Sequence, residues 1–459
     1  MAETSVDVIV IGSGQAGVPF ATRMAGAGKQ VVLIERADLG GTCVNVGCTP
    51  TKTMVASARA AHVARTGGRL GVRGAGEVTV DLAAVVARKE RIVAEWRGGV
   101  ESGLRAAGDK LRLVRGHGRF VAAGVVEAGG ERFRAKTTVV NVGCRPVHPK
   151  LPGLEGVPFL TNRTVMQLQA LPKHLVVLGG GYIGCEFAQM FRRFGAEVTI
   201  VDRGEHLLSR EDPEVSVELE KVFAAEGLRL EQRSKVASVA KDGDGVVVRL
   251  EGGKEIRGSH LLVAVGRQPN TGDLGCDAAG IALDDKGFIQ TDDHYKTTAD
   301  GVYAVGDCIG GPQFTHNSWD DHRLLARYLE TGQGHGRSGR FVPSSVFTDP
   351  QVAGVGLTER EAKKQGIAYE LATLPFSSIS RALEVDEPAG VLRVLVDPKT
   401  ERVLGAHIVG ADAGELIHIF VALMQAGASA RTILDMQAIH PTFAEGVQQV
   451  VMSLARFGS

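Results

Sequence analysis

One pattern occurs twice in this chain and limits its fold more than any other feature. The first copy begins with a β-branched apolar run at residues 6–11, and Gly12, Gly14 and Gly17 follow in GxGxxG spacing. A helix-like stretch and a second apolar run then lead to Glu35. A strand, a glycine turn, a helix and a second strand ending in an acid are typical of a parallel α/β sheet.

The second copy repeats these features in the same order. An apolar run at 175–178 precedes Gly179, Gly181 and Gly184, and a strand-like run ends at Asp202. Each of these four residues lies 167 positions after its counterpart in the first copy. A lone GxGxxG is a weak signal, but two copies in the same context predict two dinucleotide-binding units.

The residue types explain why such a unit binds a dinucleotide. The first glycine allows the tight turn, the second lets the backbone approach a pyrophosphate, and the third lets the helix pack against the strand. The helix N-terminus offers free N–H groups to the phosphates, and the acid accepts hydrogen bonds from a ribose. Two copies most simply predict a flavin and a nicotinamide nucleotide.

The composition excludes several classes of function. Lys and Arg number 52, as do Asp and Glu, so the net charge is zero, which argues against a general nucleic-acid binder or a polybasic membrane clamp. No run reaches the roughly 18 apolar residues of a membrane span, and the acidic N-terminus is unlike a secretory signal. We expect a cytoplasmic protein without a nucleic-acid or membrane partner.

Two of the six cysteines, Cys43 and Cys48, lie close together in a glycine-rich segment. Pro50 and the helix-compatible run after it place Cys48 at a helix N-terminus, where the helix dipole lowers the pKa of a thiol. Lys52 adds positive charge on the same helix face, and Cys43 is expected in the preceding loop. The spacing also permits two buried free thiols or a zinc site, but no second Cys/His pair at ligand spacing is nearby. A redox-active pair is favoured, and no metal is expected.

The segment GGTCVNVGCTPTK at residues 40–52 resembles the redox-active segment of the flavin-dependent pyridine nucleotide–disulfide oxidoreductases. That family includes dihydrolipoamide dehydrogenase, glutathione reductase, mycothione reductase and mercuric reductase. The resemblance covers nearly the whole chain, and it implies FAD in the first unit and NAD(P)H in the second. Further matching segments are 143–146, 264–271, 303–307, 346–350 and 439–445.

The resemblance also implies which residues hold the two cofactors. Those expected at FAD are Gly12, Gly14, Gly17, Glu35, Gly41, Thr42, Lys52, Gly143 and Asp307. Those expected at NAD(P)H are Gly179, Gly181, Gly184, Asp202, Arg203 and Gly266. Asp202 favours NADH and Arg203 favours NADPH, so the choice of nicotinamide stays open.

A chemical route follows from the same resemblance. Reduced nicotinamide would reduce the flavin, which would reduce a Cys43–Cys48 disulfide. Cys48 would be the thiolate facing the flavin, and Cys43 would attack the substrate disulfide. Lys52 would lie near the flavin and pair with Glu186, for which the plainer interpretation is a surface position on a helix.

The segment 439–445 resembles the HPTxxE motif of the family's disulfide reductases. His440 would be the acid/base for Cys43 of the other subunit of a homodimer, and Glu445 would orient it. Taken alone, a histidine before a proline is more often structural. Residues 451–459 lack the cysteine pair that mercuric reductase carries near its C-terminus, and no Cys-x-x-Cys domain is found at the N-terminus.

We therefore expect a reductase of a small-molecule disulfide, of the low-molecular-weight thiol or lipoamide type. The alternatives are a metal-ion reductase like mercuric reductase and an NAD(P)H-dependent reductase of quinones or oxygen. The expected fold is α/β, with two Rossmann-like domains and a C-terminal α+β dimerisation domain, in which the alternating run at 391–396 predicts a half-buried strand. The expected domains are 1–150 with 272–340 for FAD, 151–271 for NAD(P)H, and 341–459 for dimerisation.

Overall fold

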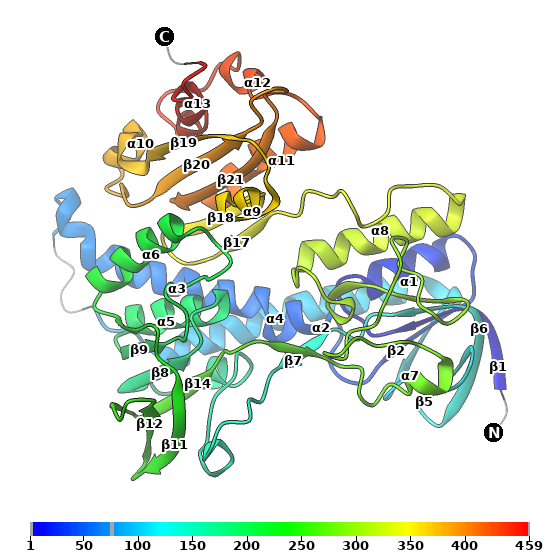
Figure 1. The fold of residues 1–459 in the computed structure, drawn as a ribbon. Coiled ribbons are helices and arrows are strands. Elements are labelled where there is room, and N and C mark those ends of the chain that lie inside the picture. Colours follow the sequence, from blue (N-terminus) through cyan, green and yellow to red (C-terminus); the bar gives the residue numbers. More distant parts are fainter. Residues whose placement is uncertain (1–2, 74–77, 458–459) are drawn as a thin grey trace. The chain divides into compact units, whose positions relative to one another are not determined.

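The structure is a computed structural model that describes residues 3–73 and 78–457. The chain folds into two compact units (Figure 1). The first unit comprises Met1–Thr53, Val86–Val147 and Gly266–Arg340. The second comprises Met54–Val85, His148–Val265 and Phe341–Ser459. Both units are built from non-contiguous segments, and the three predicted domain boundaries stay a prediction.

The first unit contains a parallel sheet that carries the first glycine turn. Its strand order is β3-β2-β1-β6, with β16 paired to β6 in parallel and β5 and β4 continuing antiparallel. The strands are β1 (Glu3–Ile11), β2 (Val31–Glu35), β3 (Leu111–Arg115), β4 (Arg119–Ala122), β5 (Val125–Ala128), β6 (Glu131–Val140) and β16 (Val302–Ala304). A separate antiparallel pair joins β7 (Cys144–Pro146) to β15 (Arg267–Pro269). Helix α1 (Gly17–Gly26) follows the turn and packs against α8 (Thr315–Thr331).

Further helices belong to this unit wholly or in part. A short helix, α2 (Gly41–Val46), precedes the long helix α3 (Cys48–Thr66). Helix α4 (Leu82–Ala106) follows it, and α7 (Cys276–Ala279) packs near β4. β2 is buried along its whole length, as expected of a strand inside a parallel sheet.

The second unit contains a smaller parallel sheet that carries the second glycine turn. Its order is β10-β9-β8-β14, and all of its pairs are parallel. The strands are β8 (His174–Leu178), β9 (Glu197–Val201), β10 (Arg229–Glu231) and β14 (His260–Val263). Helix α5 (Tyr182–Phe194) packs on β8 and β9, and α6 (Pro213–Ala225) packs on β10. An antiparallel sheet of β11 (Val236–Asp242), β12 (Gly245–Leu250) and β13 (Glu255–Gly258) lies beside it.

The C-terminal part of the second unit is an antiparallel sheet of order β17-β18-β21-β20-β19. Its strands are β17 (Ser344–Val346), β18 (Gln351–Gly356), β19 (Glu370–Pro375), β20 (Val391–Val396) and β21 (Val403–Gly410). Helix α11 (Ala413–Gln425) packs on β18 and β21, and α13 (Ala444–Met452) packs on β19 and β20, which encloses a core around Phe376 and Phe420. Shorter helices are α9 (Glu359–Gln365), α10 (Ser380–Glu384) and α12 (Arg431–Leu434).

Two parallel sheets, each with a glycine turn after a strand, and one helix-covered antiparallel sheet confirm the predicted fold class. The prediction for residues 391–396 was half wrong: they form β20, but all six are buried. Arg393 is 3% exposed because carboxylates neutralise its guanidinium inside the protein, as described below.

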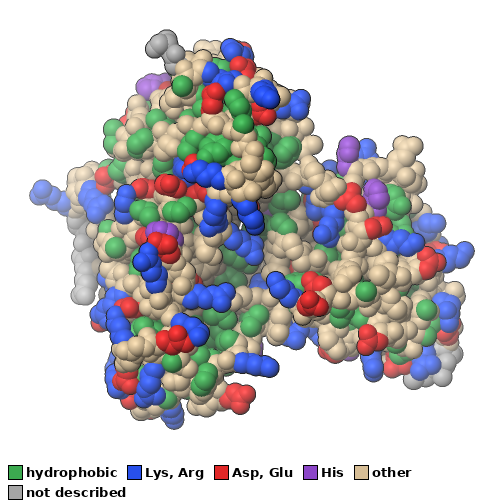
Figure 2. All heavy atoms as spheres, in the orientation of Figure 1, with side chains coloured by type: hydrophobic (Ala, Val, Ile, Leu, Met, Phe, Trp, Pro, Cys, Tyr) green, Lys and Arg blue, Asp and Glu red, His purple; other side chains and the backbone are tan. Residues whose placement is uncertain are grey.

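On the face shown in Figure 2, basic and acidic side chains are interspersed, which agrees with the zero net charge. Across residues 3–73 and 78–457, no helix combines the length and the apolar character that crossing a membrane requires.

Candidate active site

The first glycine turn is packed so tightly that side chains are excluded from it. Gly12 has a φ of 102°, and a Cβ there would lie 2.3 Å from the Asn141 carbonyl oxygen. A Cβ on Gly17 would lie 2.0 Å from the Gly12 carbonyl oxygen. The Gly17 amide donates to the Asn141 side-chain oxygen at 3.0 Å, and Gly14 faces the same oxygen. Asn141 therefore braces the turn, a role that the sequence pattern did not indicate.

Glu35 ends β2 beside this turn, as predicted. Its carboxylate is buried and accepts hydrogen bonds from the Ser13 amide at 2.9 Å, the Ser13 hydroxyl at 2.6 Å and the Ala37 amide at 2.7 Å. These contacts fix the acid at the carboxyl end of a parallel strand, where such folds bind ribose. The turn and the acid together fit the adenosine half of FAD.

The second glycine turn is packed in the same way at two of its glycines, but there is free space beside the third, Gly181. A Cβ on Gly179 would lie 2.5 Å from the Ala264 carbonyl oxygen, and one on Gly184 would lie 1.9 Å from the Gly179 carbonyl oxygen. A Cβ on Gly181, at the N-cap of α5, would meet nothing within 4 Å. The open side of Gly181 fits the close approach of a pyrophosphate to a helix N-terminus.

Asp202 follows β9 and is held by backbone amides on both sides. Its two carboxylate oxygens accept from the Gly180 and Gly204 amides, each at 2.6 Å. Arg203, the other residue predicted to select the nicotinamide, is exposed. Gly266, also predicted at the nicotinamide, has a φ of 137° and lies in the first unit, where its carbonyl accepts from the Val147 amide.

The cysteine pair lies where two helices meet, within the segment Met1–Thr53 of the first unit. Cys48 begins α3, which confirms its predicted position at a helix N-terminus. Cys43 lies within α2, so the predicted loop was wrong. Gly40 and Gly41 have φ values of 93° and 64° and turn the chain sharply enough for a helix to start at Gly41. A Cβ on Gly41 would lie 2.8 Å from the Gly14 Cα, so the cysteine segment packs directly on the first glycine turn.

The sulfurs of Cys43 and Cys48 are hydrogen-bonded to each other, and they contact the hydroxyl of Thr315, which is distant in the sequence. A side-chain hydrogen bond with Cys48, together with burial, raises the pKa of the Cys43 thiol. Cys48 is an exposed residue, and its sulfur lies 3.1 Å from the Thr315 hydroxyl. Lys52, one helical turn after Cys48, works in the opposite direction and lowers the pKa of Cys43. In the reduced pair, the raised pKa means that the Cys43 thiol retains its proton at neutral pH.

The other cysteines are poor nucleophiles. Burial raises the pKa of Cys144 and of Cys308 to about 12, and that of Cys276 to about 11. Burial also raises the pKa of Cys185, which is fully enclosed. Among the six cysteines, only Cys43 and Cys48 escape full burial.

Three further residues predicted at FAD lie in the first unit. Asp307 pairs with Arg267 at 2.7 Å, and both side chains are largely enclosed. Gly143 has a φ of 63° and an open Cβ direction. Thr42 lies in α2 beside Cys43, and its carbonyl oxygen would lie 2.8 Å from a Cβ on Gly47.

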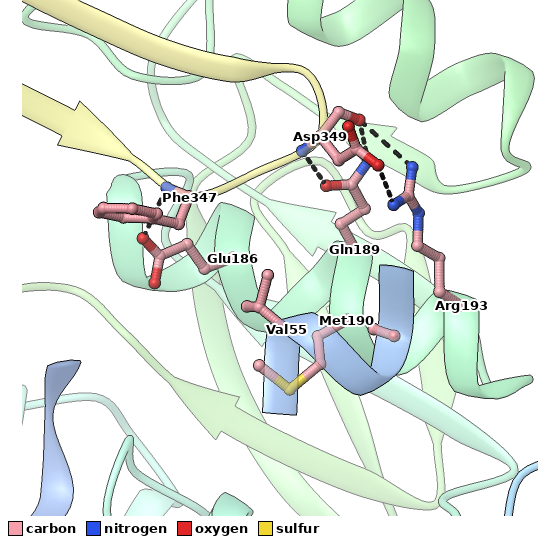
Figure 3. Close-up of a pocket in the computed structure, with 8 residues that line it drawn as sticks. Val55, Glu186, Gln189, Met190, Arg193, Phe347 and Asp349 are labelled. Carbon is pink, nitrogen blue, oxygen red and sulfur yellow. Dashed lines mark hydrogen bonds and ion pairs between the residues drawn. The ribbon is translucent and has the colours of Figure 1, made fainter. Parts of the chain in front are cut away.

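Glu186 lies in a small pocket of the second unit and not on the surface, which excludes the plainer interpretation of this residue. It is 4% exposed, and its carboxylate accepts from the Phe347 amide at 2.9 Å (Figure 3). Gln189, one turn further along α5, exchanges two hydrogen bonds with the Asp349 backbone, and Arg193 pairs with the Asp349 carboxylate at 2.6 Å. One face of α5 thereby clamps the segment that leads into β18. The predicted pairing of Glu186 with Lys52 stays a prediction, because the two residues belong to different units.

His440 and Glu445 form a contact in the second unit. The His440 Nδ1 lies 3.0 Å and 3.2 Å from the two carboxylate oxygens, and the Thr442 amide donates to the carboxylate at 3.0 Å. The His440 side chain is 68% exposed, whereas that of Glu445 is 18% exposed. An exposed imidazole oriented by a nearly buried carboxylate is suited to proton transfer with a group outside its own fold.

No three His, Cys, Asp or Glu side chains among the described residues are grouped closely enough to hold a metal ion.

Comparisons with known proteins agree over nearly the whole chain. A family profile described as pyridine nucleotide-disulphide oxidoreductase matches residues 6–321, and one described as the dimerisation domain of that family matches residues 342–451. The chain is 36% identical over 451 residues to a mercuric reductase of Bacillus cereus, covering 97% of this chain and 71% of that protein. It is also 36% identical over 459 residues to a dihydrolipoyl dehydrogenase of Thermus scotoductus, covering 98% and 97%.

A solved structure gives the same picture. The HOCl-induced flavoprotein disulfide reductase RclA from Escherichia coli matches with a TM-score of 0.89 at 33% identity, covering 97% of this chain and 99% of that one. A Cu(II) complex of RclA matches with the same TM-score at 32% identity, covering 98% and 99%.

Proposed function

Because this chain belongs to the pyridine nucleotide–disulphide oxidoreductase family, an enzyme family that uses FAD and NAD(P)H, we propose that it reduces a small-molecule disulfide through Cys43 and Cys48. The observation that carries the proposal is the contact between these two sulfurs at the N-terminus of α3. The other four cysteines are buried, so none of them is a candidate for exchange with a substrate disulfide.

The proposed exchange balances two electrons. Bound FAD supplies the redox chemistry that carries electrons from the nicotinamide to the cysteine pair. In the dithiol form, the Cys43 sulfur attacks the substrate disulfide, forms one S–S bond and releases one thiol. The Cys48 sulfur then attacks Cys43, releases the second thiol and re-forms the Cys43–Cys48 bond. Two protons pass to the two thiols that leave.

Cys43 needs a base for this exchange, because its pKa is raised by Cys48 and by burial. We assign that role to His440. Donation from Nδ1–H to Glu445 would leave Nε2 as the basic nitrogen. The dimerisation domain and the exposed ring support a His440 lent by a second copy of the chain.

NADH is the proposed reductant. The Asp202 carboxylate is fixed by two amides at the end of β9, where the adenosine ribose of a bound dinucleotide lies in this fold. A fixed carboxylate accepts from a 2′-hydroxyl and repels a 2′-phosphate. We expect kcat/KM for NADH to exceed that for NADPH by at least about tenfold. Asp202→Ala should lower this ratio.

A metal-ion reductase is the second candidate, since mercuric reductases are among the relatives and RclA has been solved as a Cu(II) complex. The oriented His440–Glu445 pair favours disulfide exchange, because electron transfer to a metal ion does not require a proton acceptor for a thiol.

One set of assays separates the candidates. The protein is tested with NADH and NADPH against lipoamide, glutathione disulfide, other low-molecular-weight disulfides, Hg(II) and Cu(II). His440→Ala is expected to lower disulfide turnover by about 100-fold or more while flavin reduction by NADH is kept. His418→Ala, at an exposed position on α11, is the matched control. Turnover of metal ions alone would refute the proposed function, and equal disulfide rates in His440→Ala and the wild type would refute the assigned role of His440.

A further inference from the structure

A hydroxyl from a distant helix reaches the cysteine pair. The Thr315 Oγ1 lies 3.1 Å from the Cys48 Sγ, although 267 positions separate the two residues in the chain. Thr315 is the first residue of α8, a helix of 17 residues. The positive end of α8 therefore faces the same sulfur that begins α3.

The same hydroxyl also acts on the second sulfur. The hydrogen bond between Cys43 and Cys48, together with burial, raises the pKa of Cys43. The side-chain hydrogen bond from Thr315 lowers that pKa. A donor that reaches both sulfurs stabilises negative charge on whichever of them is ionised.

We propose that Thr315 is a positioning residue for the redox pair, and that its hydroxyl donates a hydrogen bond to the thiolate that forms when the Cys43–Cys48 disulfide is reduced. The inference rests on the proposed function, because it requires the pair to cycle between dithiol and disulfide. It adds Thr315 to the mechanism and predicts an effect on the reduction potential of the cysteine pair.

The consequence is a shift of the reduction potential. A hydrogen bond to an ionised group is stronger than one to a neutral group, so Thr315 stabilises the thiolate form more than the disulfide form. A pair whose reduced form is stabilised is the stronger oxidant. Thr315 thus favours electron transfer from the flavin to the sulfurs, and it keeps a larger fraction of Cys48 ionised at neutral pH.

The test compares Thr315→Val, which removes the donor and keeps the shape, with Thr315→Ser, which restores a hydroxyl. In the reduced holoenzyme, the pH dependence of Cys48 alkylation by iodoacetamide, followed by peptide mass spectrometry, gives the thiol pKa. We expect Thr315→Val to raise that pKa by about one unit and to lower the midpoint potential by about 30 mV, the equivalent of a tenfold change in the dithiol–disulfide equilibrium. Thr315→Ser should return both values to those of the wild type.

Thr331→Val, at the other end of α8, removes an exposed hydroxyl and is the matched control for which neither value should change. Should Thr315→Val not fold, Thr315→Ala makes the same comparison with a smaller side chain. Wild-type pKa and potential in the folded variant would overturn the role of Thr315. A wild-type protein that takes up only the two electrons of its FAD during reductive titration would instead overturn the proposed function.

Discussion

At the scale of single residues, the His440–Glu445 contact keeps the Glu445 carboxylate ionised, and the carboxylate in turn orients the imidazole. The backbone hydrogen bond from Thr442, followed by the side-chain bond with His440, lowers the pKa of Glu445 below its ordinary value. The carboxylate therefore stays ionised throughout the pH range in which a histidine titrates. A permanently ionised partner fixes the imidazole in one orientation. A loss of turnover on acidification to about pH 5 would report protonation of a group other than Glu445.

The first prediction concerns Glu445→Gln. The neutral amide can donate as well as accept, so it no longer fixes the Nδ1–H tautomer of His440. We expect disulfide turnover to fall by about tenfold, while the rate of flavin reduction by NADH in stopped-flow absorbance stays at the wild-type value. Glu415→Gln, in the first turn of α11, is the control. An equal loss in both half-reactions would show that Glu445 has only a structural role.

The second prediction concerns the six thiols. At pH 8 the buried Cys144, Cys276 and Cys308 remain protonated, because burial raises the pKa of each to between about 11 and about 12. We expect brief alkylation of the reduced native protein to label only Cys43 and Cys48, because the other four thiols are buried. Peptide mapping by mass spectrometry shows which thiols are labelled, and rapid native labelling of Cys144 would contradict the prediction.

At the scale of secondary-structure elements, a buried ion network joins β20 to the N-terminus of α6. The Arg393 guanidinium lies 3.1 Å from the Asp212 carboxylate and 2.7 Å from that of Glu359, and Asp212 also accepts from the Glu359 and Arg360 amides. Arg393 and Asp212 are 3% and 2% exposed. The network explains how a strand with a charged residue in its middle can be buried on both faces.

Truncating Arg393 leaves the Asp212 charge buried without its cation. The third prediction is that Arg393→Ala lowers the free energy of unfolding by about 3–5 kcal/mol. The exposed pair of Arg431 with Glu401 supplies the control, since Arg431→Ala should cost at most about 1 kcal/mol. Thermal and urea unfolding followed by circular dichroism measure both variants. Equal midpoints for the two would show that the buried network does not stabilise the fold.

The sequence predicted the elements of the site better than the contacts that tune it. Both glycine turns, the acids after the strands and the helix start at Cys48 depend on local backbone requirements, which short motifs report. Asn141 lies 124 positions from Gly17 and Thr315 lies 267 positions from Cys48, and no local pattern connects residues so distant. The burial of Arg393 was missed for the same reason, because its neutralising partners lie at the N-cap of α6 and in α9.

At the scale of the whole molecule, the proposed chemistry divides between residues of two units. Cys43 and Cys48 belong to the first unit, and His440 and Glu445 belong to the second. The dimerisation-domain match over 342–451 includes the second pair. If the site is shared between subunits, a Cys43 and a His440 that act together come from different chains.

The fourth prediction tests whether the active site is shared between two subunits. We expect the Cys43→Ser and His440→Ala homodimers each to keep at most about one hundredth of the wild-type disulfide turnover. In a mixed dimer, the Cys43 of the His440→Ala chain meets the His440 of the Cys43→Ser chain, so one of two sites is complete. Random pairing makes about half of the dimers mixed, so co-refolding or co-expression should restore about a quarter of the wild-type rate. Two different affinity tags allow the mixed dimer to be purified and assayed, and its rate should then be about half of wild type. An inactive mixed dimer would place both groups of each site in a single chain.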